Sequence, residues 1–268
     1  MKLTFVGGGN MASALIAGLL GEGYSRDEIE VVEVSDEPRQ RLEKDLGVKS
    51  FSDIAETSPC DCFVLAVKPQ QLKAVALQLA PLLQSQLVIS IAAGIRSSDL
   101  SRWLGEYPAI VRVMPNTPAL VRMAISALYA MPQVSEQQRR EAEKIMRAVG
   151  ETLWLNEEAK MDAVTAVSGS GPAYVFYFLE ALSEAARELG FNSNDARKLA
   201  LTTFRGAIKL ATDSGEDFAQ LRAKVTSKGG TTERALQTME GAVIKQAIIR
   251  AIRAAAERSE ELGRELGA

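Results

Sequence analysis

Short apolar strand-like runs alternate with helix-like segments over the first 155 residues, and after that the strand signals stop. This alternation predicts βαβ units, in which a parallel sheet is covered by helices on both faces. The runs expected to form strands are Leu3–Val6, Glu30–Val34, Phe63–Val67, Leu87–Ile91 and Ala109–Val113, with edge strands at Leu128–Met131 and Thr152–Leu155. The helices expected between them are Met11–Leu20, Pro38–Leu46, Gln70–Leu83 and Glu136–Val149.

The remainder of the chain reads as helices alone. Gly171 and Pro172 stand where a helix can begin, and Gly190 stands where it can end. We therefore expect an α/β domain over residues 1–156 and an all-α domain over residues 157–268. The expected helices of the second domain are Glu157–Thr165, Ala173–Leu189, Asp195–Thr212, Phe218–Val225, Thr232–Met239 and Val243–Leu262.

The helical part carries wide apolar faces, for example at Phe176, Phe178 and Leu182. A small domain cannot bury that much apolar surface by itself. The simplest partner for such a face is a second copy of the chain, so the pattern predicts a homodimer.

Composition excludes several kinds of chemistry. The 268 residues contain no histidine, which excludes Ser-His-Asp hydrolases, Cys-His proteases, histidine zinc sites and histidine proton shuttles. A formal net charge of −3 argues against nucleic acid as a partner. No apolar run reaches the roughly 18 residues that a membrane span needs. The apolar stretch at the start of the sequence is too short for a signal peptide. We therefore expect a cytoplasmic protein with no membrane or nucleic-acid partner.

The two cysteines, Cys60 and Cys62, exclude a disulfide framework, and they are too few for a metal site. No metal is therefore expected. Cys62 enters an apolar run and is expected to be a core residue.

A glycine-rich loop follows the first expected strand and opens the first expected helix. Gly7, Gly9 and Ala12 occupy the three small-residue places of the pattern G-x-G-x-x-A. The first glycine allows a tight turn, the second lets the backbone approach a pyrophosphate, and the third small residue allows close packing of helix and strand. The phosphates would lie at the helix start near Asn10 and Met11. The alternative is a glycine-rich turn with no ligand.

The end of the second expected strand bears on the choice between NADP and NAD. Ser35 stands just past it with Arg39 and Arg41 nearby, and a hydroxyl with arginines suits the 2′-phosphate of NADP. An acidic residue would instead bind the ribose 2′-hydroxyl of NAD, and Glu33 or Asp36 would do so if the strand ended two residues earlier. We expect NADP(H), with NAD(H) as the alternative, and Ser35 as a cofactor contact.

Ligands of doubly wound sheets bind beyond the carboxyl ends of the strands. The loops after three further expected strands therefore supply candidate cofactor contacts. Lys68 is one of them, and the alternative for a lysine in a loop is that it is only solvated. Ala93 lies in a small-residue turn that would let the nicotinamide half pass close by, and Asn116 offers both a donor and an acceptor. The cofactor contacts expected here are Val67, Lys68, Pro69, Ala93 and Asn116.

Two polar, glycine-containing segments precede helix starts in the second half. The segment Ser168–Tyr174, which includes Ser170, is either a ligand cradle or a capping turn. The segment Val225–Thr232 delivers backbone N–H groups and hydroxyls to a helix start, which is a place that binds anions such as a carboxylate. Lys228 would add positive charge there.

Taken together, these segments resemble the pyrroline-5-carboxylate reductase family. The matching segments, in family order, are Gly7–Ala12, Ala66–Gln70, Met114–Pro118, Ser168–Tyr174 and Val225–Thr232. The resemblance implies a Rossmann-type dinucleotide-binding domain followed by an all-α dimerisation domain, with the active site where they meet across subunits. It also implies hydride transfer from NAD(P)H to 1-pyrroline-5-carboxylate, giving L-proline, by a homodimer that can assemble into a larger ring.

Carried over by position, the resemblance implies that Ser227, Gly230, Thr231 and Thr232 hold the substrate carboxylate and ring, together with Ser170. The Thr232 hydroxyl would lie near the imine nitrogen as the catalytic group.

Two departures from the family pattern stand out. Lys228 replaces a usual proline. Ser35–Pro38 replaces an Asn-Arg-Ser-Pro sequence, which removes an arginine that would meet a 2′-phosphate.

Reduction of a cyclic imine needs no imidazole, because the cofactor carries the hydride and solvent can protonate the nitrogen. Two alternatives remain open. One is a 3-hydroxy-acid dehydrogenase with a catalytic lysine, for which Lys160 is the candidate. The other is a dinucleotide-binding sensor without turnover, against which the presence of both substrate segments argues.

Overall fold

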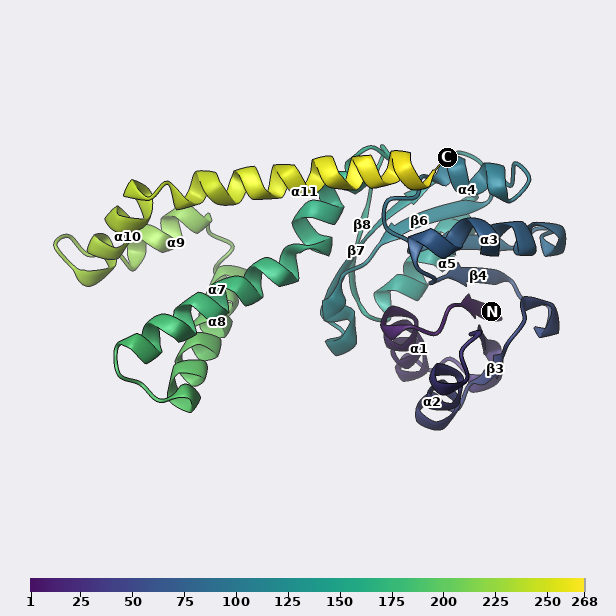
Figure 1. The fold of residues 1–268 in the computed structure, drawn as a ribbon, viewed down its shortest axis with the longest axis horizontal. Helices are drawn as coiled ribbons and strands as arrows, with labels where there is room; N and C mark the ends of the chain where they lie inside the picture. Colours follow the sequence, from purple (N-terminus) through teal and green to yellow (C-terminus); the bar gives the residue numbers. More distant parts are fainter. Residues whose placement is uncertain (268) are drawn as a thin grey trace. The chain divides into compact units, whose positions relative to one another are not determined.

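The computed structural model describes residues 1–267, which form two compact units (Figure 1). Unit 1 contains Met1–Ser170 and the chain from Ala254 onward, and unit 2 contains Gly171–Arg253. The last strand ends at Trp154 and every later regular element is a helix, so the expected change of fold type is confirmed. The domain division after residue 156 stays a prediction, because it follows the element types whereas the compact units divide at Ser170.

Unit 1 is built on one eight-stranded sheet in the order β3-β2-β1-β4-β5-β6-β7-β8. Strands β1 to β6 are parallel, β7 is antiparallel to β6, and β8 is parallel to β7. The strands are β1 Leu3–Val6, β2 Ile29–Val32, β3 Lys49–Phe51, β4 Cys62–Leu65, β5 Leu87–Ser90, β6 Ile110–Met114, β7 Ala124–Ala130 and β8 Gly150–Trp154.

The expected parallel sheet is confirmed for β1 to β6, and the sheet departs from it at one end, where β7 runs antiparallel to β6. Between β6 and β7 the chain has only the 3₁₀ turn Thr117–Val121, which is too short for the crossover that a parallel neighbour needs. Strand β8 pairs with the other side of β7, so β7 lies inside the sheet and is not the edge strand that its sequence suggested. The short polar strand β3 and the helix α4, Ser97–Trp103, had no clear sequence signal.

Helices cover both faces of the sheet, as expected. One apolar core packs strand residues against α1 (Asn10–Gly21), α2 (Asp36–Leu46) and α5 (Glu136–Arg147). The other packs the alternate strand residues against α3 (Pro69–Leu79) and α4. Cys62 is fully buried in the first core, and burial raises the pKa of its thiol well above the ordinary value, which confirms it as a core residue.

Unit 2 consists of helices. Its helices are α7 Gly171–Glu188, α8 Ser193–Ser214, α9 Phe218–Lys224, α10 Thr231–Gly241 and the first part of α11, Ile244–Leu266. Helices α7 and α8 pack against each other. Large apolar side chains nevertheless stay exposed on both of them, including Phe176 (66% exposed) and Leu210 (65% exposed). Their exposure supports the expectation that unit 2 packs against a second copy.

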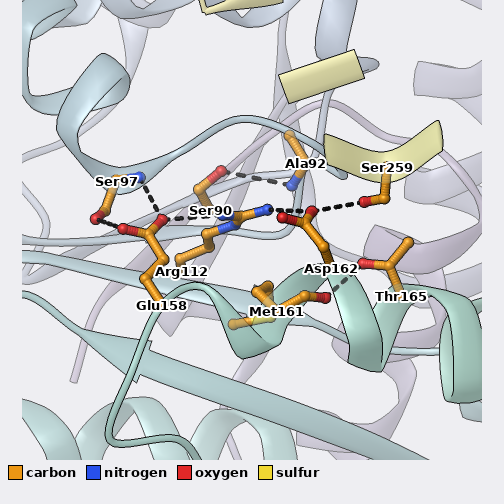
Figure 2. A network of polar contacts seen from close by, with 9 residues as sticks. All are labelled: Ser90, Ala92, Ser97, Arg112, Glu158, Met161, Asp162, Thr165 and Ser259. Carbon is orange, nitrogen blue, oxygen red and sulfur yellow. Dashed lines mark hydrogen bonds and ion pairs between the residues drawn. The ribbon is translucent and has the colours of Figure 1, made fainter. Parts of the chain in front are cut away.

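A buried network of hydrogen bonds and ion pairs connects several elements of unit 1 (Figure 2). Arg112 on β6 is 4% exposed and donates Nη1 to Oε1 of Glu158 at 2.9 Å, with Nη2 4.0 Å from Oδ1 of Asp162. Glu158 accepts from the backbone N–H and the hydroxyl of Ser97, at 2.7 and 2.6 Å. Asp162, on α6 (Lys160–Val164), accepts from the hydroxyl of Ser259 on α11 at 2.7 Å. The network thus joins β6, α4, α6 and the end of α11.

Replacing Arg112 by alanine would leave two part-buried carboxylates unpaired. We expect the free energy of unfolding to fall by about 3–5 kcal/mol, measured by urea denaturation. The control is Arg147→Ala, which removes an exposed ion pair to Glu143 and should cost under about 1 kcal/mol. Equal losses in the two variants would contradict a structural role for the network.

Candidate functional site

The carboxyl ends of neighbouring parallel strands lie at one edge of the sheet in unit 1. The register pairs Val6 of β1 with Leu65 of β4, Leu65 with Ser90 of β5, and Ser90 with Arg112 of β6. The loops after these strands therefore lie side by side at that edge. They carry most of the residues expected to contact a cofactor: Gly7, Gly9, Asn10, Met11, Val67, Lys68, Pro69, Ala93 and Asn116.

The glycine loop has the geometry of a pyrophosphate cradle. Gly7 has φ +102°, and a Cβ there would lie 2.7 Å from the carbonyl oxygen of Ala66, so only glycine fits. Gly9 is the N-cap of α1, and a Cβ placed on it would meet no atom within 4 Å. The first turn of α1 contains no acidic residue, and Asn10 is exposed. The open helix N-terminus therefore fits a dinucleotide's phosphates.

Glu33 is one of the two acidic residues that the sequence analysis gave as alternatives to Ser35. Strand β2 ends at Val32, two residues earlier than expected, so Glu33 is the first residue beyond it. Its carboxylate accepts from the backbone N–H groups of Gly8 and Ser35, each at 2.9 Å. Ser35 is exposed and is the N-cap of α2. The signal for Glu33 was present, but it depended on a strand boundary that propensity does not place to within two residues.

The loops after β4 and β5 differ in how closely they pack. Val67 is half-buried, and its Cγ1 would lie 3.0 Å from a Cβ on Gly7, so it packs against the glycine loop. Lys68 is exposed at the N-cap of α3, followed by Pro69 at the first helical position. Ala93 is half-buried.

Two motifs that are far apart in the sequence meet after β6. Asn116 donates Nδ2 to the carbonyl and the hydroxyl oxygens of Ser168, at 3.3 and 3.4 Å, and its Oδ1 accepts from the N–H of Ile125 at 3.1 Å. A Cβ on Gly169 would lie 2.5 Å from Cε of Met114. Both ends of the Asn116 amide thus hold this region together.

Ser168 and Gly169 belong to the segment that the sequence analysis gave as either a ligand cradle or a capping turn. They lie in the π-helical turn Thr165–Gly169, which follows α6, and α7 begins at Gly171. The N–H of the half-buried Ser170 donates to the carbonyl oxygen of Thr165 at 2.8 Å. The hydrogen bond of a π-helical turn spans one residue more than that of an α-helical turn. Such single turns often occur at functional sites.

The segment before α10 in unit 2 forms a second open helix start. Gly230 is the N-cap of α10 with no side-chain cap, and its N–H donates to the carbonyl oxygen of Ser227 at 3.0 Å. A Cβ on Gly230 would lie 2.4 Å from Oγ of Ser227, so a larger residue here would displace the Ser227 hydroxyl. Thr231 and Thr232 open the helix, the first exposed and the second half-buried.

Glu233, which the sequence analysis did not select, shapes the same turn. Its carboxylate accepts from the N–H of Gly229 at 2.7 Å, and Gly229 has φ +71°. Lys228, which directly precedes Gly229, is exposed.

Lys160, the candidate catalytic lysine if the chain were a 3-hydroxy-acid dehydrogenase, lies on the surface of α6. Its Nζ is 3.3 Å from Oε1 of Glu157 in an exposed ion pair. Within residues 1–267, no group of three or more Cys, Asp or Glu side chains is arranged to hold a metal ion.

Comparison with known proteins relates the whole chain to one family. A family model described as pyrroline-5-carboxylate reductase dimerisation matches residues 158–262, and one described as NADP oxidoreductase coenzyme F420-dependent matches residues 2–94. The pyrroline-5-carboxylate reductase of Pseudomonas aeruginosa is 43% identical over 99% of this chain and 98% of its own length. The chain belongs to the pyrroline-5-carboxylate reductase family.

Solved structures of pyrroline-5-carboxylate reductases have the same fold. That of Coxiella burnetii is 40% identical, with a TM-score of 0.90 over 97% of this chain and 98% of that one. That of Plasmodium falciparum, solved with NADP bound, is 31% identical, with a TM-score of 0.89 over 98% of each chain. Both the resemblance and the expected fold class, a Rossmann-type domain followed by a helical dimerisation domain, are confirmed.

The two glycines of the coenzyme loop should respond differently to substitution. Gly7→Ala strains the backbone and should lower the free energy of unfolding by about 1–3 kcal/mol in urea denaturation. Gly9→Val should leave stability within about 0.5 kcal/mol, because the residue faces open space. It should nevertheless weaken binding of a nicotinamide coenzyme at least about tenfold in a fluorescence titration, by blocking the approach of the phosphates. Unchanged binding in Gly9→Val would contradict the cradle.

Proposed function

We propose that this chain reduces 1-pyrroline-5-carboxylate to L-proline with a hydride from NAD(P)H, which is the last step of proline biosynthesis. The observation that carries the proposal is the relationship to pyrroline-5-carboxylate reductases over 99% of the chain. The glycine loop and the open start of α10 support it, because they supply places for phosphates and for a carboxylate.

The bound NAD(P)H supplies the hydride. The backbone of Gly7 and Gly9 and the first N–H groups of α1, those of Asn10 and Met11, would hold its pyrophosphate. The open space at Gly9 and the absence of acidic residues in the first turn support this assignment. The side chains proposed to line the rest of the cofactor are Ser35, Val67, Lys68, Pro69, Ala93 and Asn116.

The start of α10 would bind the substrate carboxylate. The N–H groups of Thr231 and Thr232 have no side-chain cap before them, and a helix N-terminus favours a negative charge. Gly230 keeps the approach clear, and Ser227 and Ser170 would add hydroxyl contacts to the ring.

The hydroxyl of Thr232 would orient the imine nitrogen. As the hydride bonds to the carbon of the C=N group, the π electron pair moves to the nitrogen, which holds a proton taken from solvent. The protein then needs to fix geometry and shield the site rather than to supply a strong acid. A chain without histidine is compatible with this requirement.

Residues 157–268 would form a dimerisation and substrate domain, and the active unit would be a homodimer. The dimerisation family model over residues 158–262 and the exposed apolar side chains of α7 and α8 support this assignment. The dimers would assemble further into a larger ring, and light scattering of the purified protein tests this assembly.

A cytoplasmic location would fit a biosynthetic enzyme that draws on the cell's coenzyme pool. Among residues 1–267, no helix has the length and apolarity to cross a bilayer.

Thr232→Ala should lower kcat at least about tenfold, because a hydrogen bond to a charged or polarised nitrogen is lost. Turnover is followed as loss of NAD(P)H absorbance with 1-pyrroline-5-carboxylate. Thr232→Ser should retain most of the activity. The control is Thr238→Ala on the same helix, whose hydroxyl donates to the carbonyl oxygen of Arg234 at 3.1 Å.

Full turnover in Thr232→Ala would contradict the catalytic role of that hydroxyl. Oxidation of neither coenzyme by the wild-type protein would overturn the proposed reaction, and coenzyme binding without turnover would favour a sensor.

A further inference from the structure

We propose that Glu33 makes this chain select NADH over NADPH. This inference rests on the proposed function, because it names which of the two coenzymes the reaction uses. The sequence analysis expected NADP(H) with NAD(H) as the alternative, and this inference reverses that order. Its basis is the set of contacts that Glu33 makes and the charges around that residue.

The carboxylate of Glu33 is held in place against the glycine loop. One oxygen accepts from the N–H of Gly8 and the other from the N–H of Ser35, both at 2.9 Å. A Cβ on Gly8 would lie 3.2 Å from the Cβ and 3.3 Å from the Cγ of Glu33, so the Glu33 side chain packs directly against the glycine loop. A carboxylate fixed by two backbone N–H groups has little freedom to turn away from a ligand on that loop.

Glu33 also lines a pocket of about 260 Å³ that opens beside the start of α1. The residues lining this pocket are Gly8, Gly9, Asn10, Ser13, Glu33, Glu37, Pro38, Arg41 and Leu42. The pocket adjoins the N–H groups proposed for the pyrophosphate and lies beyond the end of β2. In a dinucleotide-binding fold this is the side on which the adenosine ribose is bound.

The two coenzymes differ only at the ribose 2′ position. A 2′-hydroxyl can donate a hydrogen bond to a carboxylate, whereas a 2′-phosphate is a dianion that a carboxylate repels. The N–H of Ser35, which would be a donor for a phosphate at the start of α2, already donates to Glu33. The first turn of α2 adds two more carboxylates, those of Asp36 and Glu37.

The nearby arginines are already engaged with acidic partners. Arg39 forms an ion pair with Asp36 and donates Nη1 to the carbonyl oxygen of Glu33 at 3.1 Å. Arg41 lies 3.6 Å from Asp45 in an exposed ion pair. The pocket therefore holds two carboxylates and a single guanidinium, which is unfavourable for a phosphate dianion.

The wild-type protein tests the proposal without substrate. Binding of NADH and NADPH is titrated in parallel by the change in nicotinamide fluorescence. We expect the Kd of NADPH to exceed that of NADH by about tenfold or more, as one close like-charge contact predicts. Equal binding, or tighter binding of NADPH, would overturn the proposal.

Glu33→Gln removes the charge and keeps the shape of the side chain. We expect the NADPH-to-NADH ratio of Kd values to fall about tenfold, mostly through tighter NADPH binding. The control is Glu43→Gln, on α2 and outside the pocket, where the carboxylate accepts from Ser50. It makes the same change in net charge and should leave the ratio within about twofold. An unchanged ratio in Glu33→Gln overturns the assignment to this residue.

Glu33→Ser serves as a second variant if the glutamine variant does not fold, and the wild-type ratio requires no variant. Turnover of 1-pyrroline-5-carboxylate is measured separately with each coenzyme. Turnover with an unexpected preference refutes the role of Glu33 alone, whereas absence of turnover with both refutes the proposed function.

Discussion

The guanidinium of Arg112 is the point on which unit 1 depends. It is buried in β6 and needs counter-charges, which Glu158 and Asp162 supply from the segment that follows the sheet. Those carboxylates in turn bind hydroxyls on α4 and α11. Since β6 leads into Asn116 and α6 leads into the π-helical turn, the same interaction brings Asn116 and Ser168 together. A charge that would be costly to bury alone thus organises one end of the candidate site.

The charged groups proposed to contact the coenzyme are Lys68 and Glu33, whereas the groups proposed to hold the phosphates and the substrate are uncharged. The glycine loop and the start of α10 both present backbone N–H groups without a side-chain cap, and the other proposed substrate contacts come from hydroxyls. Such groups have fixed protonation over the physiological range, so the site would owe its action to position. This fits a chain that contains no histidine, because in the proposed reaction the coenzyme supplies the hydride and solvent supplies the proton.

The sequence could predict those parts that depend on local chemistry. The glycine loop, the buried runs of β4 and β5 and the change to helices after Trp154 all have local signals. Other features depend on distant partners. The π-helical turn rests on Asn116, some fifty residues earlier in the chain, and β7 turns back because the preceding connection is short. The sequence left Glu33 undecided because its place depends on where β2 ends.

The division of the chain into units bears on how the protein is made. Unit 1 is not contiguous, since its sheet and first helices are synthesised before unit 2 and the end of α11 afterwards. The hydroxyl of Ser259, which completes the partners of Asp162, is therefore absent while the ribosome makes residues 171–253. A nascent chain would hold all eight strands of the sheet, with the polar network lacking one partner, until Ser259 emerges. Chaperones that protect partly folded domains during synthesis would then have a defined interval in which to act.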